Sequence, residues 1–151
     1  MQDIQITQNF KLSEFLKTNT RLPNSPSQEH TNNIAYMCST FLEPLRQSLG
    51  KKIIITSGFR SREVNKYVGG SSTSAHLEGL AVDITSDMPA SSLFITCVKF
   101  FDNYLPAVDQ IIEYSGWVHL GFKPIGKAGR MDYTAVSPAG RAFLNTKKNA
   151  N

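Results

Sequence analysis

Two short apolar runs in the last third of the chain constrain the fold most. The first is Asp109–Tyr114 and the second is Trp117–Phe122, with the turn-forming dipeptide Ser115-Gly116 between them. Both runs are rich in β-branched and aromatic residues, and a two-residue turn between such runs is typical of a β-hairpin. Because side chains alternate along a strand, three apolar residues of the second run share one face and His119 points to the other. We therefore expect a hairpin that buries one face and presents a histidine on the opposite face.

Two further residues have side chains that suit a metal site together with His119. His76 follows a polar loop, and the apolar run 80–84 predicts a short buried strand that returns Asp83 towards His76. Two imidazoles and one carboxylate hold Zn²⁺ at about 2.0–2.2 Å and leave the fourth tetrahedral position open, as in catalytic sites. A closed structural zinc site normally uses thiolates, and the chain has only two cysteines, far apart in sequence. The three residues therefore predict a catalytic zinc site.

Other charged side chains near these positions suggest catalytic roles. Glu113 precedes the turn of the predicted hairpin, so we expect it to lie near His119 and to act as the general base. Asp109 and Glu78 are the next candidates for this role. Arg60 has a permanently charged planar group, which suits a substrate carboxylate or a developing oxyanion.

Each of these residues also has an ordinary structural interpretation. A histidine in a strand is more often a hydrogen-bonded core residue, and an aspartate after an apolar run often ends a strand. Glu113 near a turn is otherwise a solvated surface charge, and Arg60 is otherwise the partner in a structural ion pair. Residue types and spacing alone leave both interpretations open.

Several polar or aromatic residues flank the expected site. The small, polar loop 69–74 leads directly into His76, and it is either a flexible connector or one wall of a substrate cleft. We expect the substrate to contact five residues: Arg60, Ser57, Ser74, Gln110 and Trp117.

Three motifs in order resemble the M15 group of zinc peptidases. They are SGFRS at 57–61, SAHLEGLAVDIT at 74–85 and EYSGWVHL at 113–120. The resemblance extends from about Phe10 to about Phe122. It covers the D-Ala-D-Ala carboxypeptidases and phage endolysins, which share their fold with the hedgehog signalling domain. We expect this fold and a peptidase activity.

The resemblance also implies roles for individual residues. His76, Asp83 and His119 match the three zinc ligands, and Arg60 matches the arginine that engages the substrate carboxylate or the polarised carbonyl. Hedgehog-like members keep a glutamate six residues before the last ligand, where this chain has Glu113. Many other members place the acidic base three residues before that ligand, where this chain has Gly116.

Helical patterns surround the predicted strands. Ser25-Pro26-Ser27-Gln28 predicts a helix with Ser25 as its N-cap and Pro26 at its first position. Apolar residues then follow the helical period as far as Leu49, and Gly50 is a suitable C-terminal cap. His30 is expected to be a surface or capping residue. Further helices are expected at 12–18, 61–67 and 89–104, and a strand at 52–56.

These elements predict an α+β fold of the hedgehog/DD-peptidase type. We expect a small, mainly antiparallel sheet with helices packed on one face and the zinc cleft on the other. The chain of 151 residues is expected to form a single zinc peptidase domain over 1–151. Its core would span about 10–122, and the segment 123–151 would be irregular, with a short helix at 138–144.

Composition limits the partners. No apolar run approaches the roughly 18 residues of a membrane span, so no membrane insertion is expected. The formal net charge of +4 favours anionic partners such as cell-wall polymers. The chain has no nucleic-acid-binding motif, so no nucleic acid is expected as a partner. Cys38 and Cys97 lie in apolar helical patterns and are expected to be reduced core thiols.

The sequence and the resemblance together predict a zinc-dependent peptidase that hydrolyses peptide bonds of peptidoglycan stem peptides. It would be a D-Ala-D-Ala carboxypeptidase or a cell-wall endopeptidase of the endolysin type. The alternative is a non-catalytic zinc-containing binding module or virion structural module. The N-terminus lacks the pattern of a signal peptide. We therefore expect synthesis in the cytoplasm and action on the cell wall, after phage-type release or as a virion component. We expect a monomer.

Overall fold

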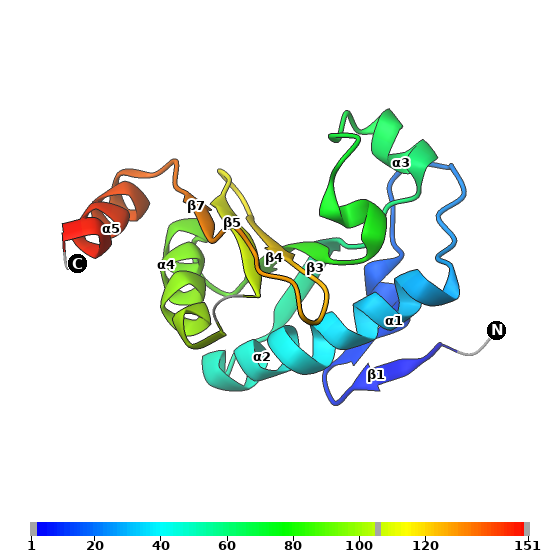
Figure 1. The fold of residues 1–151 in the computed structure, drawn as a ribbon, viewed down its shortest axis with the longest axis horizontal. Coiled ribbons are helices and arrows are strands. Elements are labelled where there is room, and N and C mark those ends of the chain that lie inside the picture. Colours follow the sequence, from blue (N-terminus) through cyan, green and yellow to red (C-terminus); the bar gives the residue numbers. More distant parts are fainter. Residues whose placement is uncertain (1–2, 105–106, 150–151) are drawn as a thin grey trace.

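The computed structural model describes residues 3–104 and 107–149, and a five-stranded sheet lies at its centre (Figure 1). From edge to edge the strands are β3 (Ile53–Ser57), β4 (Ala81–Ser86), β6 (Val118–Phe122), β5 (Val108–Glu113) and β7 (Asp132–Thr134). All neighbouring strands are antiparallel except β5 and β7, which run parallel. The α+β prediction is confirmed. The sheet is mixed, however, because the chain after the hairpin returns to add β7 alongside β5.

The other elements surround this sheet. The strands β1 (Gln5–Thr7) and β2 (Phe10–Lys11) form a separate antiparallel pair. The α-helices are α1 (Gln28–Met37), α2 (Glu43–Leu49), α3 (Arg62–Tyr67), α4 (Ala90–Phe101) and α5 (Pro138–Asn149). Short 3-10 helices are η1 (Leu12–Phe15), η3 (Ala75–Glu78) and η4 (Asp102–Tyr104), and η2 (Cys38–Leu42) is a π-helical turn between α1 and α2.

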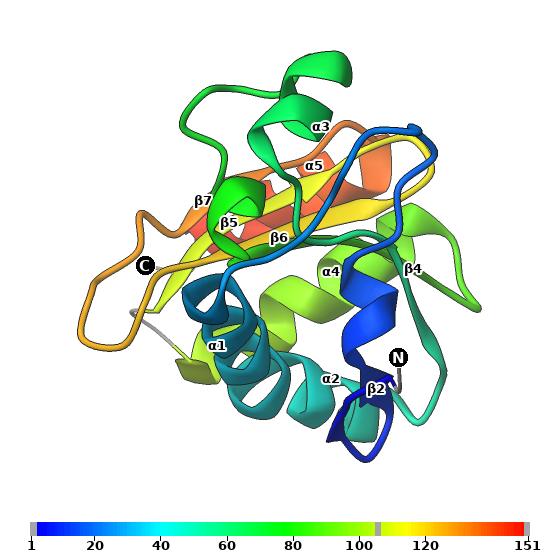
Figure 2. The same cartoon turned by 90° about the vertical axis from the view of Figure 1, so that its right-hand side faces the viewer.

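Helices α1, α2 and α4 cover one face of the sheet, and α3 lies on the other side (Figure 2). The buried apolar cluster occupies the covered face and includes Val118, Leu120 and Phe122. Phe122 stacks on Phe41, with the ring centroids 4.1 Å apart. His119 lies on the opposite face. The predicted division of the hairpin between a core face and a site face is therefore confirmed.

The first long helix begins later than predicted. Ser27, not Ser25, is the N-cap: its hydroxyl accepts the backbone N–H of His30, and the His30 Nδ1 atom accepts the N–H of Ser27. This reciprocal pair satisfies two backbone N–H groups that have no partner within the helix, which is why the helix starts after Ser27. The capping role of His30 is confirmed. At the other end, Gly50 adopts the left-handed conformation (φ 63°) expected of a C-terminal cap.

The segment after the hairpin is more regular than predicted. It contributes β7 and then the twelve-residue helix α5, in place of an irregular chain with a short helix at 138–144. The Ser137 hydroxyl accepts the backbone N–H of Gly140 and so begins α5. Phe143 and Leu144 of α5 pack against the apolar core, beside α4 (Figure 1). The C-terminal segment is thus part of the folded unit.

Both cysteines are buried free thiols, as predicted. Burial raises the pKa of Cys97 to about 12, so this thiol stays protonated and unreactive at neutral pH. None of the helices in the described part of the chain has the length and apolar character needed to cross a bilayer.

Candidate metal centre

His76, Asp83 and His119 come together on the uncovered face of the sheet. One ligand atom from each of these residues lies within 4.8 Å of the others. The Asp83 Oδ1 atom is 2.9 Å from His119 Nδ1 and 3.4 Å from His76 Nε2. The structure therefore places the three predicted ligands in one cluster.

Strand register brings Asp83 and His119 together. The two residues lie directly opposite each other in the antiparallel pair of β4 and β6, so their side chains project from the same face. His76 reaches them from η3, the short helix that precedes β4. Two strands and one helix, all in contact with the core, thus fix the three side chains.

The orientation of the His76 ring is set by a backbone carbonyl. His76 Nδ1 lies 2.7 Å from the Gly58 oxygen, and because a carbonyl only accepts, Nδ1 carries the proton. The lone pair of Nε2 therefore faces Asp83. A carbonyl or carboxylate partner of this kind usually orients metal-binding histidines.

Gly58 owes its place to a close approach of two chain segments. A Cβ atom at this position would lie 2.7 Å from the Phe15 carbonyl oxygen and 2.8 Å from the Phe15 Cα atom. The next residue, Phe59, donates its N–H to the same carbonyl at 2.8 Å. Only glycine allows the carbonyl that holds His76 to sit here.

The cluster fits a zinc ion. His76 is 1% exposed, and within the described residues its Nε2 atom has no hydrogen-bond partner. A buried nitrogen without a partner is costly in a structural site, whereas a metal ion satisfies it. Two imidazoles and one carboxylate match the ligand set of catalytic zinc sites, which keep one open position.

The Asp83 carboxyl is electrostatically prepared to remain an anion. Burial raises its pKa, but the neighbouring His119 and His76 side chains outweigh burial and hold the pKa well below its usual range. An ionised carboxylate is the form that binds a metal.

Arg60 lies beside the cluster. Its backbone N–H donates to the His76 carbonyl at 3.0 Å, which ties the arginine to the helix that carries His76. Burial lowers the pKa of the guanidinium, while the nearby Asp83 carboxylate and Tyr114 phenol act to raise it. The side chain remains a cation at neutral pH, because the ordinary pKa of arginine lies far above neutral. It has no ion-pair partner within 4 Å in the described part of the chain.

The four other residues predicted to bind substrate occupy different positions. Ser57 lies opposite Asp83 in the sheet, and the Ser74 hydroxyl accepts the N–H of His76 at the start of η3. Gln110 lies on the His119 face, although its amide donates towards Asp132 at 3.4 Å. Trp117 is 37% exposed, two residues before His119 on the same face. Their roles in substrate binding stay predictions.

The prediction that Glu113 overhangs the metal is wrong. Ile112, not Glu113, pairs with His119, and Glu113 pairs with Val118, whose side chain points into the core. Since directly opposite residues share a face, the Glu113 carboxylate projects from the helix-covered side. It is 2% exposed, and its Oε1 accepts hydrogen bonds from the Val136 N–H, the Ser137 N–H and the Ser137 hydroxyl. Glu113 therefore anchors the start of α5.

The two reserve candidates for the base differ from each other. Asp109 is buried and forms two side-chain hydrogen bonds with Arg130, at 3.0 and 2.9 Å. These bonds lower its pKa and engage both oxygens, so Asp109 has a structural role. Glu78 is exposed and lines a cavity that Arg60 and Ser74 also line.

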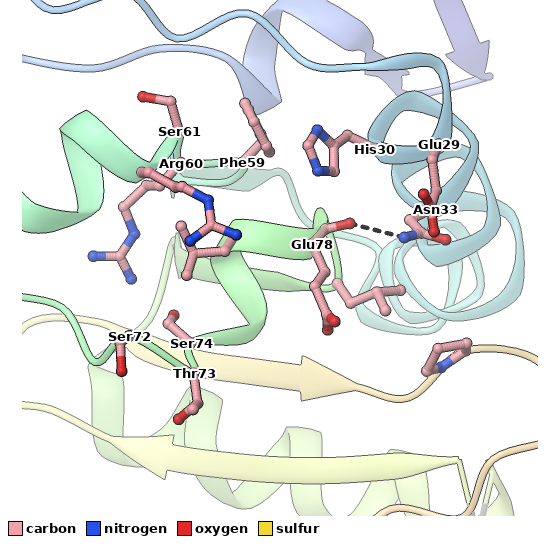
Figure 3. Close-up of a pocket in the computed structure, with 14 residues that line it drawn as sticks. Glu29, His30, Asn33, Phe59, Arg60, Ser61, Ser72, Thr73, Ser74 and Glu78 are labelled. Atoms are coloured by element: carbon pink, nitrogen blue, oxygen red, sulfur yellow. Dashed lines mark hydrogen bonds between the residues drawn. The ribbon is translucent and has the colours of Figure 1, made fainter.

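That cavity, shown in Figure 3, has a volume of about 520 Å³. It lies between the start of α1, the chain around Arg60 and the loop that leads to η3. Arg60 and Ser74 line it, while the three metal ligands do not. Ser72, Thr73 and Ser74 form part of its wall, so the polar loop is a wall of a cleft.

Two residues that position the site were not predicted from the sequence. Asn24 donates to the carbonyls of Leu16 and Phe59, both at 3.0 Å, and accepts the Ser61 N–H at 2.7 Å, so it clamps the chain on both sides of Arg60. Tyr114 stacks on Trp117, with centroids 4.9 Å apart and planes 10° from parallel. The hairpin turn itself, which brings these two aromatics opposite each other, was the available signal for Tyr114.

Comparison with known protein families identifies the family of this chain. The model of the family described as Peptidase M15 matches residues 8–121, which include all three ligands and Arg60. No curated protein matches the chain.

Proposed function

Because this chain belongs to the peptidase M15 family, a family of metallopeptidases, we propose that it is a zinc peptidase acting on peptidoglycan stem peptides. The observation that carries the proposal is the buried, unpartnered Nε2 atom of His76, which faces Asp83 and His119. A buried imidazole held in one tautomer is prepared for a metal. Zinc, when bound, supplies Lewis-acid polarisation of the scissile carbonyl and a nucleophile at neutral pH.

The protein's own residues orient the substrate. Arg60 is half-buried beside the cluster and free of ion pairs within the described residues, so it is suited to hold a substrate carboxylate or the charge that develops on the carbonyl oxygen. The stacked Tyr114 and Trp117 rings stand on the same face as His119 and form a wall that limits how the peptide lies.

The proposed substrate class rests on the resemblance to the peptidase family and on the charge of the protein. Stem peptides end in a carboxylate when they are uncrosslinked, and Arg60 suits a terminal carboxylate. A carboxypeptidase would use Arg60 in this way, whereas an endopeptidase would use it for the carbonyl oxygen. The place of action that fits is the cell wall, reached by phage-type release or as part of a virion, and the net charge of +4 favours its anionic polymers.

A second candidate function is a non-catalytic module that binds wall fragments and keeps zinc for structure. One observation favours it: within the described residues, no carboxylate other than Asp83 joins the metal cluster. If the protein is instead a peptidase, its general base has to come from outside the cluster.

Mass spectrometry of purified peptidoglycan incubated with the zinc-loaded protein separates the two functions. The peptidase releases D-Ala or cut stem peptides, and the His76→Ala variant, which lacks a ligand, releases none. If the wild-type protein pulls down with peptidoglycan but releases no product from any type tested, the binding module is the correct function.

A further inference from the structure

We propose that the cavity lined by Arg60, Glu29 and Glu78 is a subsite for the diamino-acid residue of the stem peptide, whose free side-chain amine binds the two glutamates. This inference rests on the proposed function and names the part of the substrate that the cavity selects. The ligand class is a peptide segment with a carboxylate on one side and a primary ammonium on the other.

The charges lining the cavity are divided between two sides. In Figure 3, Arg60, Ser72 and Ser74 lie on one side of the cavity, and Glu29 and Glu78 lie on the other. A second arginine, Arg62, also lines the cavity. Guanidinium groups and hydroxyls bind carboxylates, whereas glutamates bind ammonium groups. A bipolar ligand therefore matches the cavity better than a ligand of a single charge.

These charged groups are free to bind a ligand. Within the described residues, Glu29, Glu78, Arg60 and Arg62 form none of the ion pairs of the protein. Their side chains also make no hydrogen bond there, although the backbone around them is well bonded. Because these arginines and glutamates do not pair with one another, each can pair with the oppositely charged end of a bipolar ligand.

The backbone that carries the two glutamates is held in place. The Asn33 side chain on α1 donates to the Glu78 carbonyl at 2.8 Å, which joins α1 to η3. Glu29 lies in the first turn of α1, which Ser27 and His30 cap, and the His30 ring packs on Phe59 with centroids 4.6 Å apart. A prepared site of this kind spends little binding energy on ordering its own chain.

The cavity is also coupled in position to the metal cluster. Glu78 and His76 belong to the same four-residue helix, η3. Arg60 lines the cavity, and its backbone N–H bonds to the His76 carbonyl. The backbone of η3 and of Arg60 therefore links the cavity to a residue of the metal cluster.

The test compares two pentapeptides, L-Ala-D-Glu-L-Lys-D-Ala-D-Ala and the same peptide with its lysine amine acetylated. Hydrolysis by the zinc-loaded wild-type protein gives kcat/KM for each. Calorimetric titration of the Asp83→Ala variant, which lacks a metal ligand but keeps the cavity, gives each Kd without hydrolysis. Acetylation should weaken binding about tenfold or more, the effect of losing a charge-assisted hydrogen bond. The same change should reduce kcat/KM by a similar factor.

Variants locate the effect. In a protein with Glu29→Gln and Glu78→Gln, the two peptides should bind and react almost equally. The matched control is Glu63→Gln, which removes an exposed carboxylate of α3 outside the cavity and should keep the preference for the free amine. Hydrolysis of both peptides at equal rates by the wild-type protein, with equal Kd values, overturns the subsite but leaves the peptidase intact. A binding preference that depends on the glutamates, without hydrolysis of either peptide, supports the subsite and rejects the peptidase.

Discussion

At the residue scale, the metal centre depends on the fixed orientation of the His76 ring. Its Nδ1 proton is committed to the Gly58 carbonyl at 2.7 Å, and its Nε2 atom is buried next to Asp83. Gly58 and Arg60 lie in the same short run, so one chain segment orients His76 and carries the cation that we propose binds the substrate. Two predictions test the roles of these neighbours.

The Arg60→Lys variant keeps the charge but loses the planar fork that pairs with a carboxylate through two hydrogen bonds. Because Arg60 has no ion-pair partner in the described part of the chain, the melting temperature should change little. Peptide hydrolysis should fall about tenfold or more, since charge-assisted bonds contribute roughly 1.5–3 kcal/mol. Steady-state kinetics and thermal melts measure the two effects. A loss of stability as large as the loss of activity would show that Arg60 serves the fold.

The Gly58→Ala variant should damage both stability and the metal centre. Its methyl group would meet the backbone of Phe15 below 3 Å, so the segment that holds His76 must shift. We expect a loss of about 1–3 kcal/mol in unfolding free energy, the usual cost of overpacking, and weaker zinc binding. Denaturant unfolding and zinc titration with a competing chelator measure these quantities. Unchanged zinc affinity would mean that the Gly58 carbonyl does not orient His76.

At the element scale, the hairpin explains both the success and the failure of the site prediction. Alternation along β6 correctly placed His119 opposite the core residues. The same alternation, applied across the two-residue turn, pairs Glu113 with Val118 and so sends the carboxylate to the core face. There it meets the start of α5, a helix that residue patterns predicted only as a short one at 138–144. The register of β5 with β6 and the position of α5, rather than the residue type, therefore determine the role of Glu113.

The Glu113→Gln variant tests this anchoring role. The carboxylate accepts three hydrogen bonds at the start of α5 and is buried, so its replacement should cost about 1–3 kcal/mol of unfolding free energy. Zinc content should be unchanged and peptide hydrolysis should fall less than about tenfold, whereas loss of a general base costs about 10²–10⁴-fold. Full stability together with a loss of activity of that size would contradict the anchoring role.

A second contact binds the C-terminal segment to β5, and it predicts a pH dependence. Hydrogen bonds from Arg130 lower the pKa of Asp109 in the folded protein. A carboxyl group with a depressed folded pKa adds stability above its unfolded pKa of about 3.9, and this stability is lost as pH falls through the folded pKa. The Asp109→Asn variant should therefore be less stable than the wild type at pH 7, by roughly 1–3 kcal/mol.

Urea unfolding of both proteins between pH 7 and pH 2 measures this effect. The difference in unfolding free energy should shrink below about pH 4, because the wild-type carboxyl then takes up a proton. A difference that stays constant down to pH 2 would mean that the ion pair with Arg130 does not stabilise the protein.

At the scale of the whole molecule, local patterns predicted most of the core. The hairpin, the buried strand at 80–84 and the long helix follow from periodicity. The clustering of His76, Asp83 and His119 was predicted from their residue types and from the family resemblance. The C-terminal strand and the full length of the C-terminal helix did not follow, because the partners of this segment are Asp109 and Glu113, far away in sequence. The polar cavity was also not predicted, because its walls come from α1, the chain around Arg60 and the loop before η3. Such tertiary features depend on packing rather than on local pattern.

The central claim is that His76, Asp83 and His119 bind one zinc ion. Elemental analysis of the purified protein, after dialysis against zinc and removal of excess metal, tests it most directly. The wild-type protein should contain about one zinc per chain, as expected for a site with three ligands, and His76→Ala and Asp83→Ala should lose most of it. Near-stoichiometric zinc in both variants, or none in a folded wild-type protein, would contradict the claim.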